Sequence, residues 1–226
     1  MNVDWERLGD GVFRCRLPFL DVTVGLVQGA AGVLLVDTGT TLAEARAIDR
    51  DVGELAGHAV SHIVLTHNHF DHILGSSAFD EAVVYGAPEV AATKKEHLRA
   101  DAIRHGADAA EIDRAIAALR TPEHLIRHAV IDLGDRSVNV VHPGRGHTNH
   151  DLIVVVPDAR VVLCGDLVEE SGDPVIDDDS DVAAWPATLD AVLEFGGADA
   201  VYVPGHGAVV DAGFVRRQQQ WLAGRM

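Results

Sequence analysis

Histidine is unusually common in this chain, with 13 copies in 226 residues against an aromatic content of only 5%. One short segment concentrates it: residues 66–72 read Thr-His-Asn-His-Phe-Asp-His, which places His67, His69, Asp71 and His72 in an H-x-H-x-D-H pattern. Imidazole and carboxylate groups are ligands for Zn²⁺ and for Fe, Mn or Co. Such a pattern rarely arises by chance. In a loop, side chains two apart can turn toward one ion, and the adjacent Asp71 and His72 can then face a second.

Three later motifs each offer one further ligand beside small residues. His147 lies in Gly-His-Thr, Asp166 in Cys-Gly-Asp and His206 in Pro-Gly-His-Gly. Each motif borders a predicted strand, and the small neighbours allow the backbone to approach closely. Because strand ends at one edge of a sheet converge on one cleft, the motifs predict a single shared metal site.

The elements that must position these residues follow from hydrophobic periodicity and turn signals. We expect helices over residues 40–56, 185–195 and 214–223, and a charged helical segment over 88–120 that Gly106 divides. Residues 66–73 are expected to form a loop. Strands are predicted at 11–17, 23–28, 32–36, 62–65, 82–85, 128–133, 137–142, 152–156, 161–164 and 200–203. Periodicity alone indicates an α/β or α+β protein, expected as one domain over residues 1–226.

Composition narrows the classes of partner. Lys and Arg total 18 against 35 for Asp and Glu, a formal net charge of −17. This balance argues against binding nucleic acid or an anionic membrane, both of which rely on clustered cations. Two cysteines cannot make a disulfide framework. With no signal-peptide pattern and no apolar run of about 20 residues, we expect a cytoplasmic protein acting on a small molecule. The oligomeric state is left open.

Taken together with Val-Asp-Thr-Gly at residues 36–39, the ordered motifs resemble the metallo-β-lactamase-fold hydrolases over nearly the whole chain. The resemblance implies a four-layer αβ/βα sandwich. It implies two Zn²⁺ ions, with Fe or Mn as possible replacements, and a supporting role for Asp37. It assigns His67, His69 and His147 to the first metal, Asp71, His72 and His206 to the second, and Asp166 to both.

Such an enzyme would use a hydroxide between two metals to attack a carbonyl carbon. Asp71 would also be catalytic, either steering the nucleophile or passing a proton to the leaving group. The bridging Asp166 points to the glyoxalase II and lactonase-like branch, because zinc β-lactamases of the resembling families usually lack it. The expected substrate is a lactone, ester, thioester or β-lactam.

Three other readings stay open: a phosphodiesterase, an iron-dependent redox member of the same fold, and a non-enzymatic metal-binding module. His150 is either structural or a donor to a metal ligand. Residues 88–125 are a possible lid, and residues 169–180 should edge the cleft. Glu169 and Glu170 are expected to be exposed, and the acidic run at 177–179 with Asp181 is expected to be a solvated loop.

Overall fold

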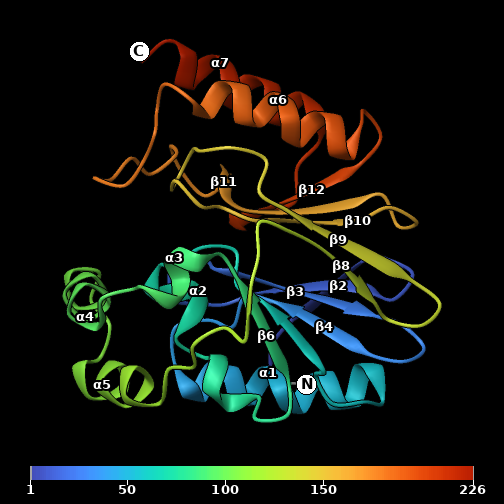
Figure 1. Cartoon of the computed structure of the whole chain (residues 1–226), viewed down its shortest axis with the longest axis vertical. Helices are drawn as coiled ribbons and strands as arrows, with labels where there is room; N and C mark the ends of the chain where they lie inside the picture. The colour runs from blue at the N-terminus through green and yellow to red at the C-terminus, as the bar shows by residue number, and fades with distance from the viewer. Residues whose placement is uncertain (1, 226) are drawn as a thin grey trace.

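Two β-sheets lie face to face, and helices cover the outer surface of each, as Figure 1 shows for this computed structural model. The structure describes residues 2–225. Helix α1 lies beneath the first sheet, and α6 and α7 lie above the second. The layers therefore run helix, sheet, sheet, helix, and the expected αβ/βα sandwich is confirmed.

The first sheet has the order β1 to β7. Strands β1 to β4 pair antiparallel, and β4 to β7 pair parallel through helical connections. A parallel array brings the carboxyl ends of its strands to one edge. The strands are β1 (Trp5–Gly9), β2 (Val12–Arg16), β3 (Thr23–Gln28), β4 (Val33–Val36), β5 (His62–Val64), β6 (Val83–Gly86) and β7 (His124–Leu125).

The second sheet has the order β12-β11-β10-β9-β8. It is antiparallel except for β11 and β12, which run parallel and are joined through α6. Its strands are β8 (His128–Asp132), β9 (Ser137–Val141), β10 (Ile153–Val156), β11 (Val161–Glu169) and β12 (Val201–His206).

Helix boundaries follow local capping chemistry. Thr41 and Glu44 form a reciprocal capping box at the start of α1, and Gly57 ends it in the left-handed conformation. Gly106 separates α4 from α5, as expected from the sequence, with a φ of 90°. The helices are α1 (Leu42–Ala56), α2 (Phe70–Ile73), α3 (Pro88–Ala91), α4 (Lys95–Arg104), α5 (Ala109–Ala118), α6 (Trp185–Gly196) and α7 (Ala212–Ala223), with a 3₁₀ turn at Ser76–Ala78.

One apolar cluster lies between the sheets and extends to α1, and a second lies between the second sheet and helices α6 and α7. The two sheets also approach each other closely. A Cβ on Gly25 of β3 would lie 2.0 Å from Leu163 Cδ2 of β11. Only glycine lets the two sheets approach this closely at that point. Among the described residues, no helix is long and apolar enough to cross a membrane.

Several sequence-based boundaries were wrong. Strands β1 and β7 were missed, because β1 alternates weakly and β7 has only two residues, both exposed. The expected loop at 66–73 contains the short helix α2. The strand predicted to end at Cys164 continues to Glu169, and every residue in it is buried. Gly165, with a φ of 53°, interrupts the register there.

Candidate metal centre

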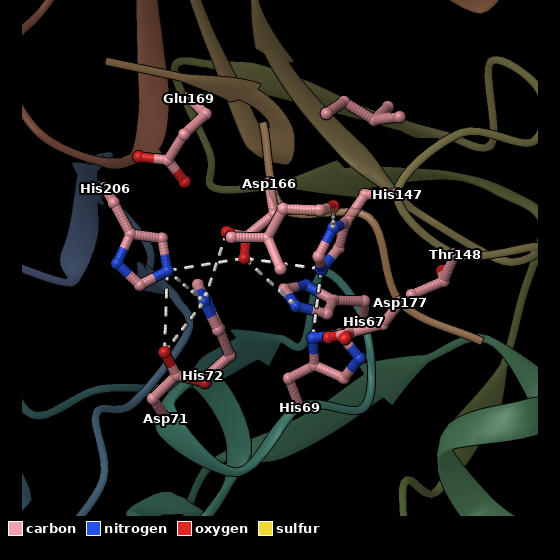
Figure 2. A network of polar contacts seen from close by, with 12 residues as sticks. His67, His69, Asp71, His72, His147, Thr148, Asp166, Glu169, Asp177 and His206 are labelled. Atoms are coloured by element: carbon pink, nitrogen blue, oxygen red, sulfur yellow. Dashed lines mark hydrogen bonds and ion pairs between the residues drawn. The ribbon is translucent and has the colours of Figure 1, made fainter. Parts of the chain in front are cut away.

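The polar residues selected from the sequence meet at the edge where strands of both sheets end, and Figure 2 shows them around Asp166. His67 and His69 follow β5, and Asp71 and His72 begin the helix α2. The other three come from the second sheet: Asp166 lies in β11, His206 ends β12 and His147 lies between β9 and β10. All seven fall into two groups whose potential ligand atoms lie within 4.8 Å of one another.

The first group consists of His67, His69, His147 and Asp166. His147 Nε2 lies 2.9 Å from His69 Nδ1 and 3.4 Å from Asp166 Oδ2. His67 Nε2 lies 3.6 Å from the same Asp166 oxygen. Three nitrogens and a carboxylate oxygen thus surround one point, which is the donor set that zinc accepts.

The second group consists of Asp71, His72 and His206. His206 Nε2 lies 3.4 Å from Asp71 Oδ2 and 3.3 Å from His72 Nε2. Asp166 reaches this group too, with its Oδ1 3.2 Å from His72 Nε2 and its Oδ2 3.3 Å from His206 Nε2. Asp166 therefore contacts both groups, at the place implied for a bridging ligand. The other nitrogen of His206, Nδ1, hydrogen-bonds to the Leu20 carbonyl at 2.7 Å.

Asp37 fixes the loop that carries the first motif. Its carboxylate accepts hydrogen bonds from the Thr66 N–H and hydroxyl, both at 2.8 Å, and lies 2.9 Å from His72 Nδ1. The hydroxyl of Thr66 also lies 2.9 Å from His67 Nδ1. Asp37 is buried and has a φ of 62°, a conformation that Asp adopts more readily than most residues. Partners of this kind orient an imidazole so that its other nitrogen faces the metal.

A matching arrangement holds the loop of the second sheet. The Asp151 carboxylate accepts hydrogen bonds from the Thr148 N–H and hydroxyl, both at 2.8 Å. This contact fixes the residue that follows His147. His150, a tentative partner of the ligands, hydrogen-bonds instead to the Asn149 side chain at 2.8 Å, and its involvement with a metal stays a prediction.

The loop at residues 171–180 positions the remaining two imidazoles. His147 Nδ1 lies 3.3 Å from the Val175 carbonyl oxygen, and His69 Nε2 lies 3.4 Å from Asp179 Oδ2. Ser180 donates its hydroxyl to the His147 carbonyl at 2.8 Å. Residues 177–179 are exposed as expected, although Asp181 is half-buried, and the exposed Asp179 also contacts His69.

Two buried polar atoms at the centre accept or donate no hydrogen bond: His67 Nε2 and Asp166 Oδ1. Leaving buried polar atoms unpaired costs about 1–3 kcal/mol each. His67 Nε2 faces the first group and Asp166 Oδ1 lies 3.2 Å from His72 Nε2 of the second, so a cation at each group would give each atom a partner. The donor types and the orphaned atoms therefore fit zinc, and no cysteine competes for it, since Cys164 is buried and faces the Val162 carbonyl.

The protonation states of the two groups differ. Burial, together with neighbouring imidazoles, lowers the pKa of His67 well below its usual value, and burial lowers that of His147 to about 4. Burial opposes charge on His72 and His206 as well. The Asp166 carboxylate nevertheless raises the His72 pKa well above its usual value and the His206 pKa to about 10. His67 and His147 thus offer free nitrogen lone pairs, whereas a metal must displace protons from His72 and His206.

Gly205 allows β12 to pass beside Asp166. A Cβ at this position would lie 1.8 Å from Asp166 Oδ1, so any side chain would force that carboxylate to move. The Gly-His-Gly motif thus has a packing reason: the glycine before His206 leaves room for the shared carboxylate.

Glu169 was expected to be exposed, which is wrong: it is 5% exposed and faces the second group. With Asp166 and His206 it forms another set able to hold a cation. Burial, aided by the Asp166 charge, raises the Glu169 pKa to about 7. Its carboxylate accepts a 2.6 Å hydrogen bond from the Ser171 hydroxyl. Recognising that β11 continues past Asp166 would have revealed this residue.

A cavity of about 230 Å³ opens directly over the centre and is lined by ligands from both groups, among them His69, Asp71 and His206. A larger cavity of about 650 Å³ continues from it between α4 and the 171–180 loop. Residues of both cavities include His69, Phe70, Asp101 and Asp177. Residues 93–105 of the helical segment predicted at 88–125 and the loop after Asp166 thus form walls of the cleft. The role of the segment as a lid stays a prediction.

The comparisons with known proteins agree on one family. Residues 17–206 match the model of the metallo-beta-lactamase superfamily. The curated type 2 metallo-beta-lactamase of Bacillus cereus is 24% identical over 197 residues, which are 84% of this chain and 69% of that protein.

The solved structures show the same fold. The metallo-beta-lactamase FIM-1 from Pseudomonas aeruginosa, in its mono-zinc form, aligns with a TM-score of 0.76 at 20% identity and covers 99% of this chain and 96% of that one. The Pontibacter korlensis enzyme aligns with a TM-score of 0.75 at 18% identity and covers 98% and 99%. With the His and Asp groups described above, the family match identifies a metal-dependent hydrolase, and the chain belongs to the metallo-beta-lactamase superfamily.

Proposed function

We propose that this protein is a dinuclear zinc hydrolase that cleaves a small carbonyl substrate such as a lactone, ester, thioester or β-lactam. One observation carries the proposal. Seven buried or half-buried side chains converge in two groups that share Asp166. One ring nitrogen of each imidazole faces the other ligands, and the second ring nitrogen contacts a neighbouring residue. This arrangement supports the proposal of a preorganised two-metal site.

The seven side chains would have the following roles. His67, His69 and His147 would hold one ion, Asp71, His72 and His206 the other, and Asp166 both. Zinc, when bound, supplies an activated water and polarises the attacked carbonyl. Hydrolysis joins the water oxygen to the acyl carbon, breaks the acyl bond to oxygen, sulfur or nitrogen, and delivers a proton to the leaving group.

Asp71 is the residue proposed to transfer that proton to the leaving group. Its carboxylate lies in the wall of the smaller cavity and is 3.4 Å from His206 Nε2. It can therefore hold a proton at the point where attacking water and leaving group both pass. The position of Asp166 between the groups supports placement in the glyoxalase II and lactonase-like branch.

The cavity above the centre disfavours phosphodiesters. Its lining contains no Lys or Arg, whereas phosphoryl transfer relies on such groups to neutralise the phosphate oxygens. Arg145, two residues before His147, pairs with Asp181 at 3.1 Å instead of lining the cavity. This supports the carbonyl substrate over the phosphodiesterase reading.

Metal content and turnover test the proposal together. We expect the purified protein to carry about two equivalents of zinc and to hydrolyse at least one member of a panel of lactone, thioester, ester and β-lactam compounds. Asp71→Ala should reduce kcat by about a hundredfold or more. One equivalent of iron with no hydrolysis would overturn the proposal in favour of oxygen chemistry. Turnover of a phosphodiester alone would support the other hydrolase class.

Asp179→Asn is expected to weaken zinc binding at the first group. Burial alone would lower the pKa of His69, but the Asp179 and Asp71 carboxylates raise it, so Asp179 supports the electron-rich, oriented imidazole. Losing such a partner typically costs about 10- to 100-fold in metal affinity. Competition with a chelator measures the affinity. Asp178→Asn removes the same charge one residue away, and equal affinities in the two variants would contradict the assignment.

A further inference from the structure

The cleft over the metal centre contains many carboxylates in addition to those of the predicted metal ligands. In the smaller cavity, the non-ligand carboxylates are those of Asp101, Glu169, Asp173 and Asp177, and the lining contains no Lys or Arg. The larger cavity adds Asp178 and Asp179. These side chains come from α4, β11 and the 171–180 loop, so opposite walls of the cleft carry the same sign of charge.

Few cations offset them. Lys94 and Arg104 are the only Lys and Arg side chains among the residues that line the two cavities. Arg104 forms an ion pair with Asp101, and His105 Nδ1 lies 3.5 Å from the same carboxylate. Arg225 lies 3.8 Å from Asp173 at the rim. His97 also faces the larger cavity, and only Lys94 brings an unpaired strong cation to it.

Bound zinc does not reverse this balance. Asp71 and Asp166 would lie at the ions, so zinc would act on the reacting end of the cleft. The walls beyond that end carry six further carboxylates, which outnumber Lys94, Arg104 and the rim residue Arg225 even with Glu169 neutral. The net charge of the whole chain, −17, acts in the same direction. A cleft lined by one sign of charge concentrates ligands of the opposite sign.

The same cavity contains independent marks of a ligand site. Asp166 lines the smaller cavity, and its buried Oδ1, which has no hydrogen-bond partner, locates the reacting end of the cleft. Apolar groups lie between that end and the acidic groove: Leu20 and Val175 line the smaller cavity, and Phe70 lines both. Val175 is 50% exposed, so apolar surface is available for a substrate to cover. An aromatic ring in such a wall also favours a cation.

We infer that this cleft selects carbonyl substrates that carry a positive charge, such as an amine or quaternary ammonium group, on the acyl side. The inference rests on the proposed hydrolase function. The carbonyl would lie at the metal centre, the acyl chain along Phe70 and Val175, and the cation between Asp177 and Asp101. An acidic substrate of the same shape would place its negative charge beside the carboxylates of Asp101 and Asp177 and would be repelled there.

Three isosteric 4-nitrophenyl esters test the inference on the zinc-loaded protein. Their acyl groups are 4-(trimethylammonio)butanoyl, the neutral 5,5-dimethylhexanoyl and the anionic 4-sulfobutanoyl. We expect kcat/KM to fall in that order, with the cationic ester favoured over the anionic one by about tenfold or more at low salt. Raising the ionic strength from about 20 mM to about 0.5 M should narrow the ratio, because salt screens the field.

Two variants test whether carboxylates in the cleft wall cause the preference for the cationic ester. The double variant D177N/D178N should reduce the ratio of cationic to anionic kcat/KM several-fold. Asp190→Asn, an exposed position on α6, should leave it unchanged. Equal kcat/KM values for the three esters, or a preference for the anionic ester, would overturn the inference. Turnover of these esters would still support the hydrolase proposal. No turnover of any carbonyl compound with zinc bound would overturn both.

Discussion

Asp166→Asn is expected to reduce kcat/KM by about a thousandfold and to lower the zinc content of the protein. The carboxylate lies within 3.6 Å of imidazole nitrogens from His67, His72, His147 and His206, so it faces both groups at once. Burial favours its neutral form, yet these imidazoles hold its pKa well below the usual range. An amide keeps the shape but removes the negative charge that both ions would share.

Elemental analysis and kinetics on the same preparation measure the two effects. Asp190→Asn on α6 removes one exposed carboxylate that belongs to neither group and controls for the general loss of negative charge. Circular dichroism separates loss of metal from loss of fold. An Asp166→Asn protein that keeps two equivalents of zinc and full activity would exclude a shared ligand at this position.

Asp37→Ala is expected to lower the free energy of unfolding by about 3–5 kcal/mol. The substitution leaves the Thr66 N–H, the Thr66 hydroxyl and His72 Nδ1 without their acceptor in a buried environment. Position 37 has a φ of 62°, and alanine tolerates this left-handed conformation less well than Asp because its side chain makes no local hydrogen bond. Both effects act on the segment that carries the first metal motif.

Urea unfolding in the presence of a chelator measures this change without a contribution from bound metal. Asp37→Asn is the matched comparison, since it retains one acceptor oxygen and tolerates the left-handed conformation. We expect it to lose less stability than the alanine variant. Equal stability of Asp37→Ala and the parent protein would show that the contacts of Asp37 are not needed to hold the loop.

The fold and the centre could be predicted from the sequence where local chemistry and position agree. His67, His69, Asp71 and His72 follow a short buried strand, and a loop or helix start after such a strand must face the sheet edge. The helix over 40–56 carried its own capping signals at Thr41 and Gly57. These features depend on neighbours in the chain, so a single sequence contains them.

Residues that depend on distant contacts escaped prediction. Glu169 reads as a surface residue, yet β11 continues past Gly165 because β12 pairs with it as far as His206. Asp179 belongs to an acidic run, and only the path of the 171–180 loop brings it to His69. Neither contact leaves a periodicity or spacing signal. The first depends on pairing between β11 and β12, and the second depends on how the loop from the second sheet lies against the first sheet.

The division of the ligands between the sheets has a mechanical consequence. His69 and His147 are 78 positions apart in the chain, and their ring nitrogens meet at 2.9 Å. An ion at either group would take donors from both sheets, and Asp166 would tie the two ions to each other. Metal would then act as a cross-link at the open edge of the sandwich, where the core gives the least support. Separation of the sheets during unfolding would require the ions to leave first, so the lifetime of the folded protein would depend on the rate of metal release.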